Sequence, residues 1–174
     1  MSTNWTVVYV PAIDADDVRE LVAKRQQDRG ERTMPDPDYL RGRGAVDFAK
    51  ERWRLDLQPS WTKDALAALA ADSSPTAQRW AEVMDLAAAT PERFISTEAV
   101  AEETSLTISD WRSACRTITR VLPRYDGVPE WATGSHAGKR VWPLADISGR
   151  DIGKKDQLYV AATREQAALW LEVR

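Results

Sequence analysis

Residues 94–125 read FISTEAVAEETSLTISDWRSACRTITRVLPRY, and their caps and apolar spacing predict two short helices joined by a tight turn. Ser96 or Thr97 is placed to cap the first helix. Thr107 and Asp110 form a capping-box signal for the second helix. The threonine oxygen can accept the backbone N–H three residues on, and the aspartate can reach back. The elements predicted before and after this stretch are interpreted by how they would pack with its two helices.

The second helix, near residues 108–122, has two different faces. Its apolar stripe follows helical spacing and is formed by Trp111, Cys115, Ile118 and Leu122. The neighbouring face carries Arg112, Arg116 and Arg120, with Ser113 and Thr117 beside them. We therefore expect one side of this helix to pack inward and the other to meet solvent or an anionic partner.

The composition is that of a soluble globular protein. Of 174 residues, 43% are apolar and 29% charged, and no apolar run approaches the roughly 18 residues that a membrane span needs. The start, MSTNWTVVYV, lacks the basic end and long apolar core of a signal peptide. One cysteine cannot form an internal disulfide, which fits a reducing compartment. We expect a cytoplasmic protein without a membrane partner.

Charge is distributed unevenly along the chain. The net charge is −3, which argues against a protein that is basic throughout. Residues 1–107 carry 13 basic and 19 acidic side chains, whereas residues 108–174 carry 11 basic and 8 acidic ones. Positive charge thus accumulates from the second helix of the central stretch onward, as a surface that binds nucleic acid requires.

The first sixty residues predict less regular structure. Residues 1–30 are expected to form a strand–helix module, with a strand over Trp5–Val10 that Pro11 ends. Residues 31–60, rich in proline and glycine, are expected to form a linker or surface loop. Within it, a short helix over Phe48–Leu57 would direct inward Phe48, Trp53 and Leu57.

Residues 61–174 predict one larger domain. Helices are expected after Trp61, with Thr62 as the cap, and from Ser74-Pro75, the second about fifteen residues long. After the central stretch, strand-like runs at 139–144 and 157–161 enclose a glycine-rich basic segment, which predicts a hairpin. Thr163 and Gln166 then predict a capped last helix.

This order of elements resembles the winged helix-turn-helix domain over about residues 75–161. The chain also resembles proteins of GC-rich bacteria that begin with a WTVVYVP-like strand and end in such a domain. The implied fold class is α+β, mainly helical, with an N-terminal strand–helix extension. The resemblance places the second helix in a major groove and the 139–161 hairpin, as a wing, on the backbone or minor groove. The implied DNA-binding residues are Arg112, Ser113, Arg116, Thr117, Arg120, Lys139, Arg140, Arg150, Lys154 and Lys155.

Two functions follow from this resemblance. The first is a double-stranded DNA-binding protein, a transcriptional regulator whose N-terminal module mediates a homodimer or a partner contact. The second is a winged-helix protein–protein interaction module without DNA binding, in which the arginines meet an acidic protein partner or stay solvated. Glu102 and Glu103 weigh against DNA if they face it, because they would repel phosphate.

No catalytic, metal or cofactor site is expected. A lone histidine, His136, excludes His-pair metal sites, and the lone Cys115 excludes a Cys-x-x-Cys site. Cys115 lies on the apolar stripe, where a cysteine acts as a small hydrophobe. The sequence therefore predicts a binding protein rather than an enzyme.

Overall fold

The computed structural model describes residues 15–28, 43–132 and 136–174, which form two units at 1–48 and 49–174. The predicted strand Trp5–Val10 lies outside the described residues. In the first unit, α1 spans Ala15–Asp28. Helix α2 (Arg43–Asp56) crosses the boundary between the units. The remaining elements are α3 (Lys63–Ala71), α4 (Pro75–Ala89), β1 (Ile95–Ser96), α5 (Thr97–Glu103), α6 (Ile108–Thr117), the 3₁₀ helices η2 (Ile118–Arg120), η3 (Leu122–Arg124) and η5 (Gly149–Ile152), β2 (Ala145–Ser148), β3 (Leu158–Ala161) and α7 (Arg164–Val173).

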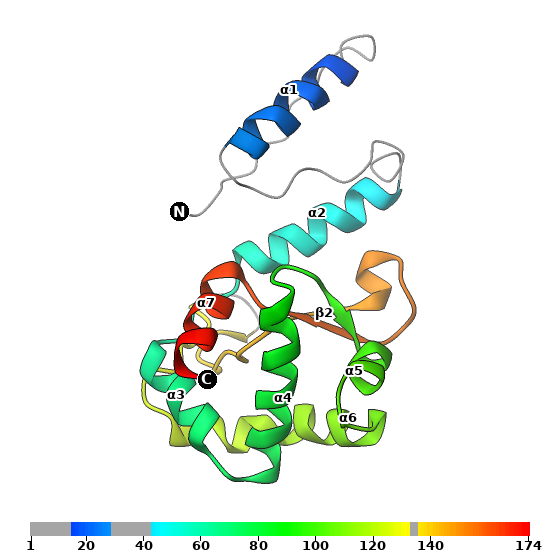
Figure 1. Cartoon of the computed structure of the whole chain (residues 1–174). Helices are drawn as coiled ribbons and strands as arrows, with labels where there is room; N and C mark the ends of the chain where they lie inside the picture. The colour runs from blue at the N-terminus through cyan, green and yellow to red at the C-terminus, as the bar shows by residue number, and fades with distance from the viewer. Residues whose placement is uncertain (1–14, 29–42, 133–135) are drawn as a thin grey trace. The chain divides into compact units, whose positions relative to one another are not determined.

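The larger unit is α+β and mainly helical. Helix α4 packs against α7, α6 and α3, and α5 packs against α6 (Figure 1). Beside these helices, the described strands form an antiparallel sheet in the order β1-β3-β2. In its register Ile147 pairs with Tyr159 and Ile95 with Val160. The sheet thus joins a short strand before α5 to a hairpin after α6.

Four tryptophans fill the core of this unit. Trp61, Trp80, Trp111 and Trp170 are fully buried. The rings of Trp80 and Trp111 meet edge to face with centroids 4.7 Å apart, which fixes α4 against α6. The buried indole nitrogen of Trp80 also donates to the carbonyl of Ala114 at 3.2 Å.

The helix starts follow the predicted caps. The hydroxyls of Thr62, Ser96, Thr107 and Thr163 each accept the backbone N–H three residues on. Ser74 precedes α4 without such a bond, but Pro75 occupies the first helical position. Each cap joins residues only three apart in the chain, so it can be predicted from the sequence without knowing the tertiary fold.

The predicted strand over 139–144 is wrong. Apart from one isolated bridge between Arg140 and Glu130, this run is irregular, and β2 begins only at Ala145. Pro143 has no N–H for a ladder, and both it and Leu144 are buried. The apolar residues of 139–144 that suggested a strand belong to an irregular segment that packs into the core.

The second central helix is also shorter than its apolar stripe. Helix α6 ends at Thr117, and two 3₁₀ turns continue the chain to Arg124. Pro123 lacks the N–H that an α-helix would donate to Thr119, so the α-helical ladder cannot continue there. Ile118 and Leu122 are nevertheless buried as the stripe predicts.

Candidate nucleic-acid interface

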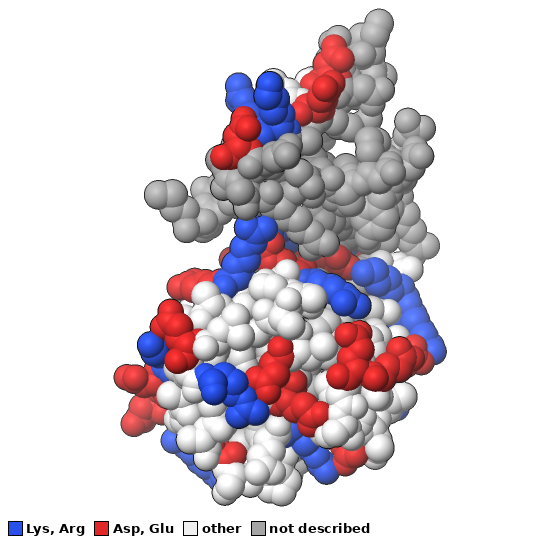
Figure 2. Space-filling view, viewed as in Figure 1, with Lys and Arg blue, Asp and Glu red and all other residues white. Residues whose placement is uncertain are grey.

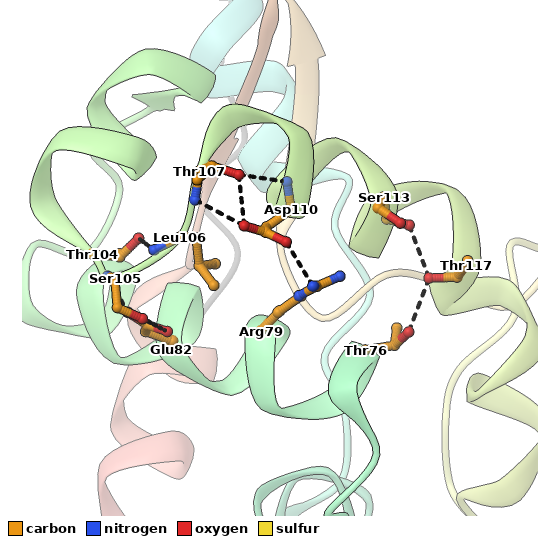
Figure 3. A network of polar contacts seen from close by, with 10 residues as sticks. All are labelled: Thr76, Arg79, Glu82, Thr104, Ser105, Leu106, Thr107, Asp110, Ser113 and Thr117. Atoms are coloured by element: carbon orange, nitrogen blue, oxygen red, sulfur yellow. Dashed lines mark hydrogen bonds and ion pairs between the residues drawn. The ribbon is translucent and has the colours of Figure 1, made fainter.

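The turn between α5 and α6 is fixed by a polar network (Figure 3). The hydroxyl of Thr107 accepts from the N–H of Asp110 at 3.1 Å, and the carboxylate of Asp110 accepts from the N–H of Thr107 at 3.2 Å. Arg79 of α4 pairs with the same carboxylate at 2.6 Å. The Thr107 hydroxyl, which also donates to it, lowers the pKa of Asp110 below its usual range. The predicted capping box is confirmed, and Arg79 ties it to α4.

Two further contacts join this motif to α4 (Figure 3). The carboxylate of Glu82 accepts from both the N–H and, at 3.0 Å, the hydroxyl of Ser105 in the turn. At the end of α6, the hydroxyls of Thr76 and Thr117 share a hydrogen bond of 2.9 Å. Because α4 contacts the turn and both ends of α6, the direction of α6 is set by the core.

The outer face of α6 carries the three predicted arginines, Arg112, Arg116 and Arg120. All three are exposed, and among the described residues none forms an ion pair. Arg120 lies on η2 rather than on α6 itself. We call these residues the α6 arginine face.

The two hydroxyl residues predicted beside the arginines are less available. Ser113 and Thr117 are both half-buried. The hydroxyl of Thr117 donates to the carbonyl of Ser113 at 2.8 Å, in addition to its contact with Thr76. Thr117 therefore uses its hydroxyl within the unit, which leaves the arginines as the principal exposed groups.

The cations of the hairpin (residues 145–161) are paired instead. Arg150 pairs with Asp156 in the same hairpin. Lys154 pairs with Glu51 of α2, and Lys155 pairs with Glu98 of α5. The Lys155 contact lowers the pKa of Glu98, as expected for an anion held beside a cation. Each of these three predicted phosphate ligands thus has a carboxylate partner within the molecule.

Lys139 and Arg140 do not belong to the hairpin, because the strand predicted for them is absent from this part of the described chain. The guanidinium of Arg140 donates to the carbonyls of Leu122 and Tyr125, at 2.8 and 3.3 Å. It satisfies the end of η3 and is half-buried. Lys139 is exposed in the preceding loop.

A groove of about 780 Å³ lies between α2, α6 and the hairpin. Lys50, Trp53 and Arg54 of α2 line it together with Arg112 of α6. Its remaining lining residues belong to the hairpin: Asp146, Ile147, Ser148, Asp151, Asp156, Gln157 and Leu158.

Sequence reasoning missed the contribution of α2. The expectation that Trp53 and Leu57 point inward is wrong, since their exposed fractions are 61% and 46%. Leu55 and Gln58 are buried instead. Leu55 packs beside Ala145 and Ala161 of the hairpin. The alternation of charged and apolar residues over 50–58 fits either phase of the helix, so tertiary contacts decide which face is buried.

Among the described residues, no group of three or more His, Cys, Asp or Glu side chains is placed to hold a metal ion. Burial raises the pKa of the Cys115 thiol to about 12, which keeps it protonated and unreactive at neutral pH. None of the described helices combines the length and apolar character that crossing a membrane requires.

Comparisons of the chain with protein-family models, with curated proteins and with solved structures find no match. The function is therefore inferred from the geometry of the chain itself. That geometry presents a helix held against the core whose arginines form no ion pair with the part of the chain that the structure describes, a hairpin with paired cations, and a groove between them.

Proposed function

We propose that this chain is a double-stranded DNA-binding protein of the winged helix-turn-helix type, with α6 as its recognition helix and the hairpin as its wing. The order of elements supports this: α4, β1, α5 and α6 are followed by a hairpin that pairs with β1. Helix-turn-helix repressors use such a helix to read DNA, so a transcriptional regulator is the role we propose for this domain.

The observation that carries the proposal is the α6 arginine face. Arg112 and Arg116 follow each other at i and i+4 on one side of the capped helix, so they project about 6 Å apart, and Arg120 follows on η2. A guanidinium can bind the O6 and N7 of guanine or a phosphate with two parallel hydrogen bonds. None of the three forms an ion pair within 4 Å among the described residues, although Arg112 lies close enough to Glu98 to contribute to lowering the pKa of that carboxyl, so binding DNA breaks no direct ion pair there.

The face of the larger unit in Figure 2 does not add a broad basic patch. On the face shown in Figure 2, acidic and basic side chains of the larger unit are interspersed among uncharged atoms. With about three phosphate or base contacts from the arginine face, the logarithm of affinity should fall with the logarithm of salt concentration with a slope of roughly −3. We therefore expect binding of moderate strength that depends chiefly on α6.

Fluorescence anisotropy with pooled random duplex DNA, at 50 and 200 mM salt, tests the proposal. We expect salt-sensitive binding that Arg112/Arg116/Arg120→Ala weakens about 100-fold or more, because three charge-assisted contacts are lost together. The matched control, Lys63/Arg93/Arg174→Ala, removes the same charge from exposed positions on other elements. If both variants lose affinity equally, the loss reflects net charge alone, and the role of α6 as a recognition helix is contradicted.

A second candidate is a protein-interaction module of the same fold. The pairing of Arg150, Lys154 and Lys155 with carboxylates favours it, because a wing that grips phosphate needs available cations. In that case the α6 arginine face would meet an acidic protein surface. Absence of duplex binding even at 50 mM salt would overturn DNA binding and leave this candidate.

A further inference from the structure

The first residue of α6, Ile108, has an exposed apolar side chain. It precedes Arg112, the first arginine of the α6 arginine face, by four positions. Side chains four apart in an α-helix lie on the same side of the helix. The capping box of Thr107 and Asp110, which Arg79 joins to α4, holds the backbone on either side of Ile108 (Figure 3). Ile108 therefore adjoins the arginine face in a fixed position.

The core of the unit does not need Ile108. Leu106 and Trp111, which have the spacing of a hydrophobic staple, are both buried. Ala114 and Ile118 fill the next inward positions and are buried as well. Ile108, by contrast, is 37% exposed. The inner side of α6 is thus complete without it, and part of its apolar side chain meets solvent.

Ile108 differs in position from the other exposed apolar side chains. Those that are also large and exposed among the described residues lie outside α6: Leu21, Trp53, Leu57 and Leu171. A single exposed apolar residue is common on protein surfaces, so exposure alone indicates no ligand. The argument for Ile108 comes from its place beside Arg112 on the helix proposed to enter DNA.

Arg112 is available to bind a base. It is exposed and forms no ion pair with the part of the chain that the structure describes. Hydrogen bonds from Lys155 and Gln157, and more weakly the charge of Arg112, lower the pKa of Glu98. Because Glu98 is held directly by Lys155 and by Gln157 at 3.2 Å, it leaves the guanidinium of Arg112 free to donate elsewhere.

The major groove presents groups that Ile108 and Arg112 can distinguish. Thymine carries a C5 methyl group there, which apolar side chains contact, and guanine offers O6 and N7 to a guanidinium. Recognition helices contact base edges with residues near their N-terminal end. The Cβ atoms of residues four apart are separated by about 6 Å, which is roughly one to two base-pair steps of about 3.4 Å. The two side chains are therefore spaced to contact neighbouring bases.

We propose that α6 recognises a thymine one or two base pairs from a guanine, with Ile108 packed on the C5 methyl of the thymine and Arg112 bound to O6 and N7 of the guanine. This inference rests on the DNA-binding function proposed above. It makes Ile108 a residue that determines sequence specificity, whereas the arginines alone would favour guanine or phosphate.

The test removes the methyl group from the DNA and the side chain from the protein. Selection from pooled random duplex DNA with the wild-type chain supplies a preferred duplex, in which each thymine is replaced in turn by deoxyuridine. At one position, the loss of the methyl should weaken wild-type binding about fourfold in fluorescence anisotropy. Ile108→Ala should bind the thymine and deoxyuridine duplexes alike, and this cycle isolates the contact between side chain and methyl.

Three further variants serve as controls. Leu171→Ala removes an exposed apolar side chain from α7 and should keep both the wild-type affinity and the full loss on deoxyuridine. Ile108→Val keeps a branched apolar side chain and should retain most of the discrimination, which separates a lost contact from a disturbed fold. Arg112→Ala should relax the preference for guanine and reduce the salt slope by about 1, whereas Ile108→Ala should leave the slope unchanged.

The outcomes separate this contact from the function itself. If the wild-type chain binds duplex DNA and the α6 triple variant does not, but every deoxyuridine change affects wild type and Ile108→Ala equally, the thymine contact is overturned and the DNA-binding function stands. The same holds if selection enriches no sequence, since binding is then independent of the bases. If the wild-type chain binds no duplex at 50 mM salt, the proposed function fails and this inference fails with it.

Discussion

The α6 arginine face and the hairpin are both rich in cations, yet they differ in what those cations contact. The three arginines of α6 and η2 are exposed and have no ion-pair partner among the described residues. The three hairpin cations Arg150, Lys154 and Lys155 are paired with Asp156, Glu51 and Glu98. The number of basic residues in a segment is therefore a poor measure of its capacity to bind an anion.

The difference has a structural cause. The inner side of α6 is fixed by Trp111, so its arginines must project away from the unit. The hairpin tip instead lies near α2 and α5, whose acidic residues reach its lysines. An anionic ligand of the hairpin has to compete with these carboxylates for the same cations. Salt weakens the attraction of the cations to the carboxylates and to the ligand alike.

The largest effect should come from the geometry that holds the hairpin. A Cβ added at Gly149 would lie 1.8 Å from the carbonyl oxygen of Lys155 and 2.8 Å from the ring of Tyr159. The backbone would have to move, so Gly149→Ala should lower the free energy of unfolding by about 3 kcal/mol. Urea unfolding followed by tryptophan fluorescence measures this loss.

Gly138→Ala is the control for that change. Its φ of +74° is unfavourable for alanine, but a Cβ there meets no atom within 4 Å. Only the backbone cost of about 1 kcal/mol should appear. A loss at Gly149 no larger than this would show that the hairpin adapts freely, and the contrast between a fixed hairpin and an exposed helix face would weaken.

A smaller effect is expected at the start of α6. Thr107→Ala removes the cap and should cost about 1 kcal/mol of stability at pH 7, whereas the exposed Thr119→Ala should cost little. Circular dichroism during thermal unfolding measures both changes. Equal costs would mean that the capping box does not stabilise α6.

The same variant changes the acid sensitivity of the fold. The Thr107 hydroxyl, with its backbone N–H and Arg79, lowers the pKa of folded Asp110 below the ordinary value of about 3.9. A depressed carboxyl pKa stabilises the folded state above that value, and this contribution is lost as pH falls below about 4. Thr107→Ala should therefore lose less stability than wild type between pH 5 and 2.

The sequence predicts the parts of the fold that depend on neighbouring residues. The capping box of Thr107 and Asp110 involves residues three apart, and its geometry follows from residue type alone. The same holds for the caps at Thr62, Ser96 and Thr163. The α+β class and the exposed arginines of α6 follow from the same local patterns.

The pairing of the hairpin cations was beyond such patterns. Lys154 and Glu51 are 103 residues apart in the chain, and Lys155 and Glu98 are 57 apart. Nothing local distinguishes these lysines from free ones. The same limit applies to Trp53, whose exposure depends on which side of α2 contacts the hairpin.

Dimerisation through residues 1–30 stays a prediction.

The smallest predicted effect bears most directly on the contrast between α6 and the hairpin. Glu98→Gln removes the carboxylate that holds Lys155 and should raise duplex affinity about threefold, because it releases one cation and removes one like charge facing phosphate. Glu102→Gln, on the same helix, removes the same charge from an exposed residue without an ion-pair partner among the described residues, and should raise affinity less. In a Lys155→Ala background the difference between the two changes should shrink to what the interaction of Glu98 with Arg112 accounts for, since no lysine is left to release. Equal effects already in the wild-type background would mean that this ion pair does not restrain the hairpin, and that paired and unpaired cations bind DNA alike.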